Sequence, residues 1–323
     1  MTDETISILS ISTRGYKRLL AVSDIHGELD LFKRLLKKVD FCDDDILVLL
    51  GDFYLKGSQV LACFDFVMEL KKLPNVFVLR GNCDWLRDDF LNDDQWAWLE
   101  SLPFIIESED FIFVHAGLED KPLDEQDLKY CLTQYAFLEV YDGKPFEKWL
   151  MVGHWPTDNL QHEVPNHNPI ICEEKRIICI DGGNVIRHDG QLNAFMVELD
   201  DETTVCIDKF SWDWVDKFPV TTAERGQEGC RGTLNITWND RFIEILEDGS
   251  GGEFSLVRHI ESGKVIEMPM EKIWWDDYGR AIGGNFATDH WLAVNEGDEI
   301  AVVAEYSDRI FAKKNGEAGW IRF

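Results

Sequence analysis

The stretch RLLAVSDIHGELDLFKRLLKKVDFCDDDILVLLGD, residues 18–52, holds two short apolar runs on either side of a helical segment. Both runs have the length of a strand, and they end at Asp24 and Asp52. Between them, apolar residues recur at helical spacing and form one face: Leu29, Phe32, Leu35, Leu36 and Val39. The pattern predicts a strand-helix-strand unit, the building block of an α/β layered fold.

The alternation of strand-like and helical segments continues to about residue 200. A second helical segment follows at residues 60–70, and further apolar runs of strand length end in polar residues. The six runs are RLLAVSD (18–24), DILVLLGD (45–52), NVFVLRGN (75–82), FIFVHAG (111–117), KWLMVGH (148–154) and RIICIDGG (176–183). We therefore predict an α/β layered domain over residues 1–200.

From about residue 203 the sequence pattern changes to β-rich segments, which are separated by turns that contain Gly, Asn and Asp. We predict a smaller, all-β accessory domain over residues 201–323, with the boundary near Asp200 or Asp201. Its last segment, GDEIAVVAEYSDRIFAKKNGEAGWIRF, is similar to bacterial SH3-like barrels. An aromatic cluster in this domain is predicted to be either an interface for a protein partner or part of the core: Trp274, Trp275 and Tyr278.

The charge balance is strongly acidic, with 61 Asp and Glu against 32 Lys and Arg and a net charge of −29. Such a surface repels nucleic-acid backbones and anionic lipids, so we expect neither nucleic-acid binding nor membrane association. The one basic run, at residues 33–38, has the spacing of a solvated helix face. An anionic substrate would need local positive charge, and bound metal ions are its densest source.

The eight cysteines form no CxxC pair and show no regular spacing. The sequence also contains no apolar leader and no apolar run long enough to span a membrane. Disulfide frameworks and cysteine-ligated zinc sites are therefore disfavoured. A reduced, cytoplasmic location is the prediction.

Polar residues with metal-binding side chains follow the predicted strands. The carboxyl ends of neighbouring strands share one edge of a sheet, so these side chains are expected to converge: Asp24, His26, Asp52, Asn82, His115 and His154. Carboxylate, imidazole and amide ligands suit Mn, Fe or Zn. Taken singly, each residue has an ordinary alternative, because Asp24 and Asp52 could cap helices and the histidines could be partly buried core residues.

Five blocks in this order, SDIHG, GDFYLKG, GNCD, HAGL and GHWPT, resemble the signature of the calcineurin-like metallophosphoesterase superfamily. The resemblance covers residue 19 to about 200 and implies a layered β-sandwich flanked by helices. HAGL and GHWPT, followed by CIDGG and GQLNA, are most similar to the branch of protein serine/threonine phosphatases that includes the diadenosine tetraphosphatases.

The resemblance also implies a ligand set for two divalent metal ions. Asp24, His26 and Asp52 would hold the first ion. The second would be held by Asp52, as a bridge, with three further residues: Asn82, His115 and His154. Mn is the expected metal, with Fe, Zn or Ni as alternatives. Hydrolysis would proceed by attack of a metal-bridging hydroxide on the phosphate.

The chain departs from the phosphatase pattern in the second and third blocks. Leu55 stands where the phosphatases carry an Asp, Lys56 replaces an Arg, and Cys83 replaces the His that protonates the leaving group. The GNCD block occurs in small bacterial phosphodiesterases of the same superfamily, but those usually end a later block in GHxH, where this chain has Pro156. The sequence is thus a hybrid of two patterns.

These departures suggest four further site residues. Cys83 and Asp84 are the candidate catalytic residues, and Lys56 and Arg80 are the candidate phosphate-binding residues. The alternatives are that Cys83 is merely small and buried, that Lys56 is an exposed loop residue, and that Arg80 and Asp84 form a structural pair. A thiol is a weaker acid than a tuned His, which favours substrates whose leaving groups need little protonation.

The predicted function is hydrolysis of a phosphate ester by a two-metal phosphoesterase, with a phosphorylated protein or nucleotide as substrate. The first alternative is a phosphodiesterase of the GNCD type. The second is a metal-stabilised binding protein without catalysis, because both members of the acid dyad are replaced. Intact metal ligands speak against the second alternative, since an unused site has no need of six ligands.

Overall fold

The computed structural model describes residues 5–85, 90–199, 205–230, 233–249 and 252–322. The chain divides into two compact units. The first unit is formed by Met1–Pro156, Pro169–Ile186 and Gly190–Asp216. The second is formed by Thr157–Asn168, Arg187–Asp189 and Lys217–Phe323.

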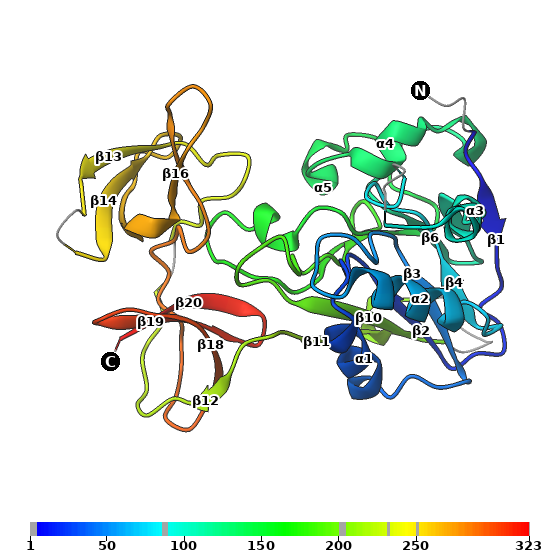
Figure 1. The fold of residues 1–323 in the computed structure, drawn as a ribbon, viewed down its shortest axis with the longest axis horizontal. Helices are drawn as coiled ribbons and strands as arrows, with labels where there is room; N and C mark the ends of the chain where they lie inside the picture. Colours follow the sequence, from blue (N-terminus) through cyan, green and yellow to red (C-terminus); the bar gives the residue numbers. More distant parts are fainter. Residues whose placement is uncertain (1–4, 86–89, 200–204, 231–232, 250–251, 323) are drawn as a thin grey trace. The chain divides into compact units, whose positions relative to one another are not determined.

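Two sheets build the first unit (Figure 1). The five-stranded sheet has the order β11-β10-β2-β3-β4. Its strands are β2 (Arg18–Val22), β3 (Asp45–Leu49), β4 (Val76–Val78), β10 (Leu192–Glu198) and β11 (Phe210–Val215). Strands β2, β3 and β4 are parallel, whereas β10 and β11 run antiparallel to their neighbours.

The six-stranded sheet has the order β1-β5-β6-β7-β9-β8. Its strands are β1 (Ile8–Ser10), β5 (Ile105–Glu107), β6 (Phe111–Val114), β7 (Trp149–Val152), β8 (Ile170–Cys172) and β9 (Ile177–Cys179). Strands β6, β7 and β9 are parallel to one another, so their carboxyl ends lie at a common edge.

The described helices of the first unit are short. They are α1 (Leu29–Lys38), α2 (Val60–Leu70), α3 (Asp93–Glu100), α4 (Leu128–Thr133), α5 (Phe137–Val140) and the 3-10 turns η1 (Leu123–Glu125) and η3 (Ile207–Lys209). Helix α1 follows β2 and α2 follows β3, as the apolar periodicity predicts. A capping box at Asn92 and Gln95 starts α3.

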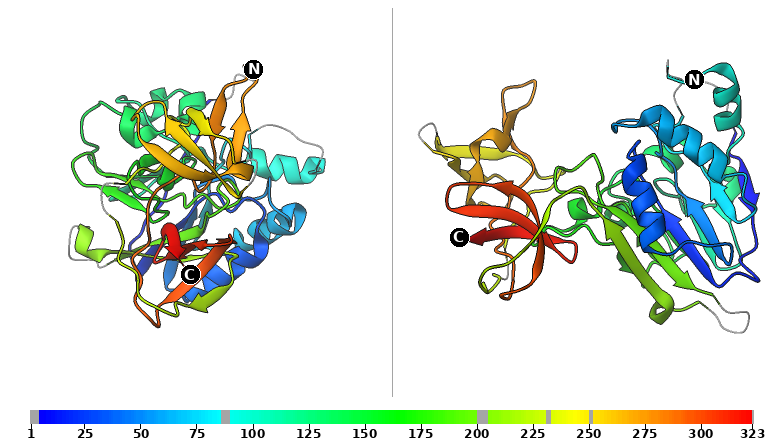
Figure 2. Two further views of the ribbon diagram at one scale, coloured as in Figure 1. Left: turned by 90° about the vertical axis from the view of Figure 1, so that its left-hand side faces the viewer. Right: turned by 60° about the horizontal axis from the view of Figure 1, so that its bottom comes forward.

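Alternate residues of the central strands enter two different cores, which shows the layering. On β2, Leu20 packs with the helical residues Phe32 and Phe64, whereas its neighbour Leu19 packs with Phe113 of the other sheet. Strand side chains alternate between faces, so helices cover one face of the five-stranded sheet and the six-stranded sheet covers the other. Figure 2 shows α1 beside this sheet. The predicted α/β layered fold is confirmed.

The second unit is all-β apart from short 3-10 turns among its described residues. Its sheets are antiparallel. Its strands are β12 (Val220–Thr222), β13 (Ile243–Glu247), β14 (Phe254–His259), β15 (Val265–Pro269), β16 (Ile273–Trp275), β17 (Ala281–Gly283), β18 (Glu299–Glu305), β19 (Arg309–Lys314) and β20 (Glu317–Arg322). The 3-10 turns are η2 (Thr157–Leu160) and η4 (Met270–Lys272). The predicted all-β character is confirmed, and the SH3-like assignment of the last strands stays a prediction.

The predicted boundary near Asp200 or Asp201 lies outside the described residues. Downstream of it, β11 pairs with β10 and therefore belongs to the first unit. The observed units also place residues 157–168 and 187–189 with the β-rich unit. Among the described helices, none is long and apolar enough to cross a membrane.

Buried charges join the two inserted segments to each other, and a hydrogen bond from Asn235 ties them to the rest of the second unit. Arg187 Nη2 lies 2.8 Å from Asp158 Oδ2, and the Asp158 side chain is fully buried. Asn235 Nδ2 donates to the other oxygen of Asp158 at 3.1 Å. His167 Nε2 lies 3.1 Å from Asp189 Oδ2, again with both side chains buried. Removing one partner of such a pair leaves an uncompensated charge in the interior.

We therefore expect Asp158→Ala to destabilise the second unit by roughly 3–5 kcal/mol, since the Arg187 guanidinium loses its buried counter-charge. Urea unfolding followed by tryptophan fluorescence measures the change. Asp44→Ala is the matched control, because it breaks an ion pair with Lys17 that is exposed to solvent. Equal stability losses in the two variants would contradict the assignment.

Candidate metal centre

The predicted ligands follow strands of both sheets. Asp24 and His26 follow β2, and Asp52 follows β3. From the remaining strands come Asn82 after β4, His115 after β6 and His154 after β7. The structure brings these side chains together at the common edge, although they are spread over 131 positions of sequence, from 24 to 154.

Four of these residues have a left-handed backbone, which is uncommon for residues other than glycine. The φ angles are 55° at Asp24, 50° at His26, 52° at Asp52 and 65° at His154. Such conformations cost free energy and persist only where the surrounding structure enforces them, typically at functional sites. The strained turns direct the side chains into one place.

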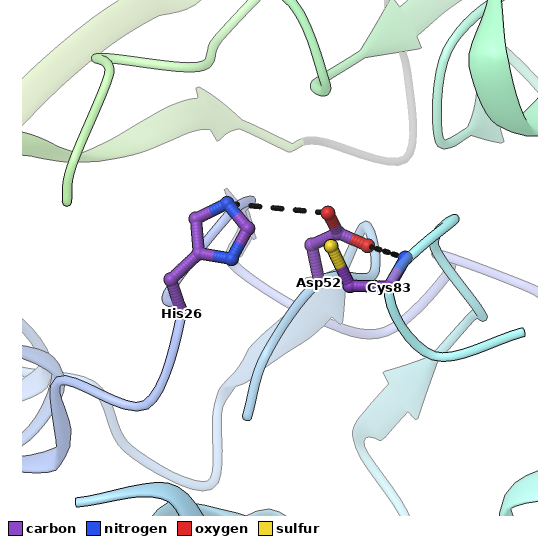
Figure 3. Close-up of side chains that lie close together, drawn as sticks. All are labelled: His26, Asp52 and Cys83. Atoms are coloured by element: carbon purple, nitrogen blue, oxygen red, sulfur yellow. Dashed lines mark hydrogen bonds and ion pairs between the residues drawn. The ribbon is translucent and has the colours of Figure 1, made fainter. Parts of the chain in front are cut away.

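Asp52 lies at the middle of the cluster. Its Oδ2 is 3.9 Å from His26 Nε2, and its Oδ1 is 3.6 Å from His115 Nε2. His26 Nε2 is also 3.5 Å from Asp24 Oδ1. Figure 3 shows Asp52 between His26 and Cys83. The two oxygens of one carboxylate thus face different histidines, as a bridging ligand requires.

The side-chain amide of Asn82 lies close to three atoms that can accept hydrogen bonds or bind a metal ion: two imidazole nitrogens and one carboxylate oxygen. Its oxygen lies 2.9 Å from His115 Nε2, 2.8 Å from His154 Nδ1 and 3.3 Å from Asp52 Oδ2. Turned around, the amide would donate its N–H groups to these atoms and accept from the N–H of Cys83, whereas the oxygen in this place suits a bound cation. This convergence of acceptor atoms is the observation that best fits a metal ion.

Hydrogen bonds to the backbone orient three of the predicted ligands. His115 Nδ1 lies 2.7 Å from the carbonyl oxygen of Leu50, so the Nδ1–H donates there and the lone pair of Nε2 points into the cluster. Asp52 Oδ1 accepts from the backbone N–H of Cys83 at 2.8 Å. Asp24 Oδ2 accepts from the backbone N–H of His154 at 2.9 Å. These hydrogen bonds hold His115, Asp52 and Asp24 in place.

Two glycines make room for the carboxylates. A Cβ atom on Gly81 would collide with Asp52, and a Cβ atom on Gly153 would collide with Ser23 and Asp24. Backbone therefore approaches the ligands more closely than any other residue would permit. The glycines of the GNCD and GHWPT blocks thus serve the packing of the site.

Burial and mutual charge set the protonation states of the cluster. Burial alone would raise the pKa of Asp24 and Asp52, but His26 and His115 outweigh it, so both carboxyl groups have lowered pKa values. Burial alone would lower the pKa of His115, and the charges of Asp52 and Asp24 raise it. Burial, followed by the charge of His115, lowers the pKa of His154 to about 4. The buried carboxylates and the neutral imidazole of His154 favour a divalent cation.

Cys83 lies close to the first predicted ligands. Its Sγ and single donor atoms of His26 and Asp52 all fall within 4.8 Å of one another, and a second such group contains Asp24, Asp52 and His115. Burial, followed by the charge of Asp52, raises the pKa of the Cys83 thiol. The thiol of the protein without metal is therefore a weak acid.

Asp84 lies behind the cluster and contacts backbone. Its Oδ2 accepts hydrogen bonds from the N–H groups of Asp52 at 2.6 Å and Gly81 at 2.9 Å, and the residue is fully buried. Burial, followed by the charge of Asp52, raises its pKa to about 7. These contacts tie the GNCD turn to the Asp52 loop, and a catalytic role for Asp84 stays a prediction.

Lys56, one of the two predicted phosphate-binding residues, lies near the cluster. It is exposed, has a φ of 82°, and interacts electrostatically with Cys83 and Asp52. Arg80 is only 2% exposed, and its guanidinium lies 4.9 Å above the Phe104 ring. This orientation places Arg80 in the core, and its role in substrate binding stays a prediction.

Asp181 is a neighbour of the site that the sequence reasoning did not assign. It follows β9 in the CIDGG segment, is 1% exposed and accepts from the N–H of Gly183 at 2.8 Å. Burial, followed by the charge of Asp24, raises its pKa. Its position after a strand that ends at the same edge is the signal that identifies it.

A model of the calcineurin-like phosphoesterase family matches residues 17–248, more than half of the chain. No curated protein matches at a significant level. Solved structures of phosphatases and phosphoesterases are similar to this chain. The three described below have TM-scores of 0.45, 0.45 and 0.41. At these TM-scores, none of the three identifies a substrate.

A putative diadenosine tetraphosphatase is 20% identical with a TM-score of 0.45, over 59% of this chain and 93% of that one. A protein serine/threonine phosphatase from Saccharomyces cerevisiae is 13% identical with a TM-score of 0.45, over 66% and 85%. A metallophosphoesterase from Sphaerobacter thermophilus is 19% identical with a TM-score of 0.41, over 62% and 89%.

The family match covers the strands that carry all six predicted ligands, and the donor set fits the divalent metals on which such enzymes depend. The chain belongs to the calcineurin-like phosphoesterase family and is a metal-dependent phosphoric ester hydrolase.

Proposed function

We propose that this protein hydrolyses phosphate esters with two divalent metal ions, with a phosphorylated protein or nucleotide as the leading substrate class. The observation that carries the proposal is the convergence of acceptor atoms from Asp52, His115 and His154 on the Asn82 amide. A phosphodiesterase is the second candidate, because the GNCD block replaces the phosphatase sequence at Cys83.

The residues present divide into two overlapping ligand groups. Asp24, His26 and Asp52 would hold one ion. The other would be held by Asp52 and three further residues: Asn82, His115 and His154. Mn is the metal we propose, since oxygen and imidazole ligands suit it. When bound, two such ions activate a water molecule and neutralise the charge of the phosphate.

The chain's own residues contribute position and charge. The contact with the Leu50 carbonyl holds His115 in one tautomer, and Asp84 fixes the Asp52 loop through its backbone. Burial would lower the pKa of Lys56, but Cys83 and Asp52 raise it, so its ammonium group remains charged. We assign Lys56 the role of binding a phosphate oxygen.

The sequence lacks the usual proton donor. Leu55 and Cys83 occupy the positions of the Asp and His dyad of the phosphatases that the chain resembles. A thiol whose pKa is raised by burial protonates a leaving group poorly at neutral pH. The enzyme would therefore favour aryl esters, diesters or anhydrides over simple alkyl monoesters.

The exposed hairpin β16–β17 supports the proposed protein partner. Trp274, Trp275 and Tyr278 are 49%, 63% and 86% exposed. The tip is ordered by Asp276, whose carboxylate accepts from the N–H of Tyr278 at 3.0 Å and pairs with Arg280 at 2.7 Å. Ordered, exposed aromatic rings are favourable anchors for an interface. The net charge of −29 favours a partner that carries positive charge.

The first prediction tests the bridging ligand. Asp52→Asn removes a shared negative charge, so metal content and hydrolysis should fall together, the rate by about 100-fold or more. Elemental analysis and an aryl phosphate assay measure the two quantities on the same sample. Asp30→Asn, an exposed acid of α1, is the matched control. Full activity of metal-free Asp52→Asn protein would contradict the two-metal proposal.

The second prediction concerns stability. Chelation should lower the melting temperature by several degrees, because metal ions that bind only the folded state stabilise it, by about 4 kcal/mol at 1,000 times Kd. Calorimetry before and after verified metal removal measures the shift. The Asp52→Asn variant should show a smaller shift, and an unchanged melting temperature of the wild-type protein would count against the ligand set.

The third prediction concerns the missing acid. The chemical step of the wild-type enzyme should depend steeply on the pKa of the leaving group. Cys83→His combined with Leu55→Asp should accelerate alkyl phosphates selectively, by up to about 100-fold, since an oriented imidazole can then donate a proton. Single-turnover rates on matched aryl and alkyl esters measure this. Cys83→Ser is the control, and equal wild-type rates on both ester classes would show that another residue supplies the proton.

A further inference from the structure

An exposed aromatic ring lies beside the proposed metal ligands. Tyr135, in the loop between α4 and α5, stacks on His154 with ring centroids 5.4 Å apart and planes 15° apart. Trp155 packs against Tyr135 at 5.1 Å. Despite these contacts, Tyr135 remains 58% exposed. The ring is therefore held by its neighbours while part of its surface is open to solvent.

The stack continues into the metal centre. The His154 ring lies 5.0 Å from the His115 ring, and His154 Nδ1 lies 2.8 Å from the Asn82 amide. Tyr135 is thus separated from the proposed ligand atoms by one imidazole ring. The Tyr135–His154 separation itself lies within the usual stacking range of aromatic rings, which is about 4.5–7 Å between centroids.

The loop that carries Tyr135 is fixed in place. The N–H of Ala116, next to His115, donates to the carbonyl of Cys131 in α4 at 2.8 Å. Gly117 has no side chain, and a Cβ atom there would lie 2.5 Å from the Phe137 ring. Ala136, next to Tyr135, has a φ of 47°. The position of Tyr135 is therefore established before any substrate binds, which lowers the entropic cost of stacking.

Tyr135 could serve only to support His154. That role requires contact with the imidazole but no exposed surface, whereas more than half of this residue is exposed. An exposed aromatic ring that lies one imidazole away from the ligand atoms is available to a flat substrate group. One imidazole ring lies between Tyr135 and the ligand atoms, and this short separation favours a ring bonded to the phosphate oxygen over one several bonds away.

We propose that Tyr135 is a specificity-determining residue that stacks on an aromatic ring esterified directly to the substrate phosphate. The substrate class is therefore an aryl phosphate ester. This inference rests on the proposed function, because it requires the phosphate to bind at the metal centre. It differs from the effect of the missing acid, since stacking acts on binding and needs no leaving group.

Phenylphosphonate and cyclohexylphosphonate are suitable probes, because both are similar in size and stable to ester hydrolysis, but only one is flat. Calorimetry with the manganese-loaded protein should show tighter binding of phenylphosphonate, by about 2- to 10-fold. Tyr135→Leu should abolish this preference and Tyr135→Phe should retain it. Val140→Ser, on the neighbouring exposed surface of α5, is the matched control and should retain the preference.

Three outcomes would overturn the inference. The first is a preference for the phenyl probe that survives Tyr135→Leu. The second is an equal loss of affinity for both probes with reduced metal content, which would make Tyr135 a support for His154. The third is Tyr135-dependent binding of adenosine monophosphate without Tyr135-dependent binding of phenylphosphonate, which would assign the ring to a nucleobase. Failure of the wild-type protein to bind either phosphonate would instead overturn the proposed function itself, and the inference with it.

Discussion

The first unit depends on one electrostatic constraint: side chains that carry lone pairs converge in a buried space with little to separate them. The oxygens of Asp52 and the Asn82 amide face imidazole nitrogens at distances of 2.8–3.9 Å. Removed from water, such groups repel one another unless a proton or a cation lies between them. The proposed pair of divalent cations would resolve the conflict for all of them together.

The scaffold around the site can be understood from this constraint. Two sheets are needed, because the ligands that follow β2, β3 and β4 meet those that follow β6 and β7 from a second layer. Four left-handed residues turn the chain sharply at the strand ends, and their strain is supported by well-packed cores on both faces of the five-stranded sheet. Backbone N–H groups then hold the carboxylates of Asp24 and Asp52.

Much of this unit is predictable from sequence, because its signals are local. Apolar runs of strand length alternate with amphipathic segments such as residues 29–39, and polar residues follow each run. The layered fold follows from that pattern. The meeting of Asp24 and Asp52 follows from the rule that parallel strands share their carboxyl ends, whereas His154 reaches them from the second sheet.

Features that depend on distant contacts have no comparable signal. The first unit extends beyond residue 203, where the sequence pattern changes to β-rich segments, because β11 pairs with β10. Strand pairing between distant residues cannot be seen in the local pattern. The burial of Arg80 against Phe104 has no signal in the local sequence. Likewise, Tyr135 reaches His154 only through the packing of its loop against residues 116–117. Local sequence determined the elements, whereas tertiary packing determined which polar groups meet.

Anomalous diffraction at the manganese edge, from crystals of the full chain grown with Mn²⁺, tests the central claim most directly. The account predicts two peaks, one against Asp24 and His26 and the other against Asn82, His115 and His154, with Asp52 in contact with both. A single peak, or manganese bound elsewhere while Asn82 donates hydrogen bonds to the two histidines, would contradict it.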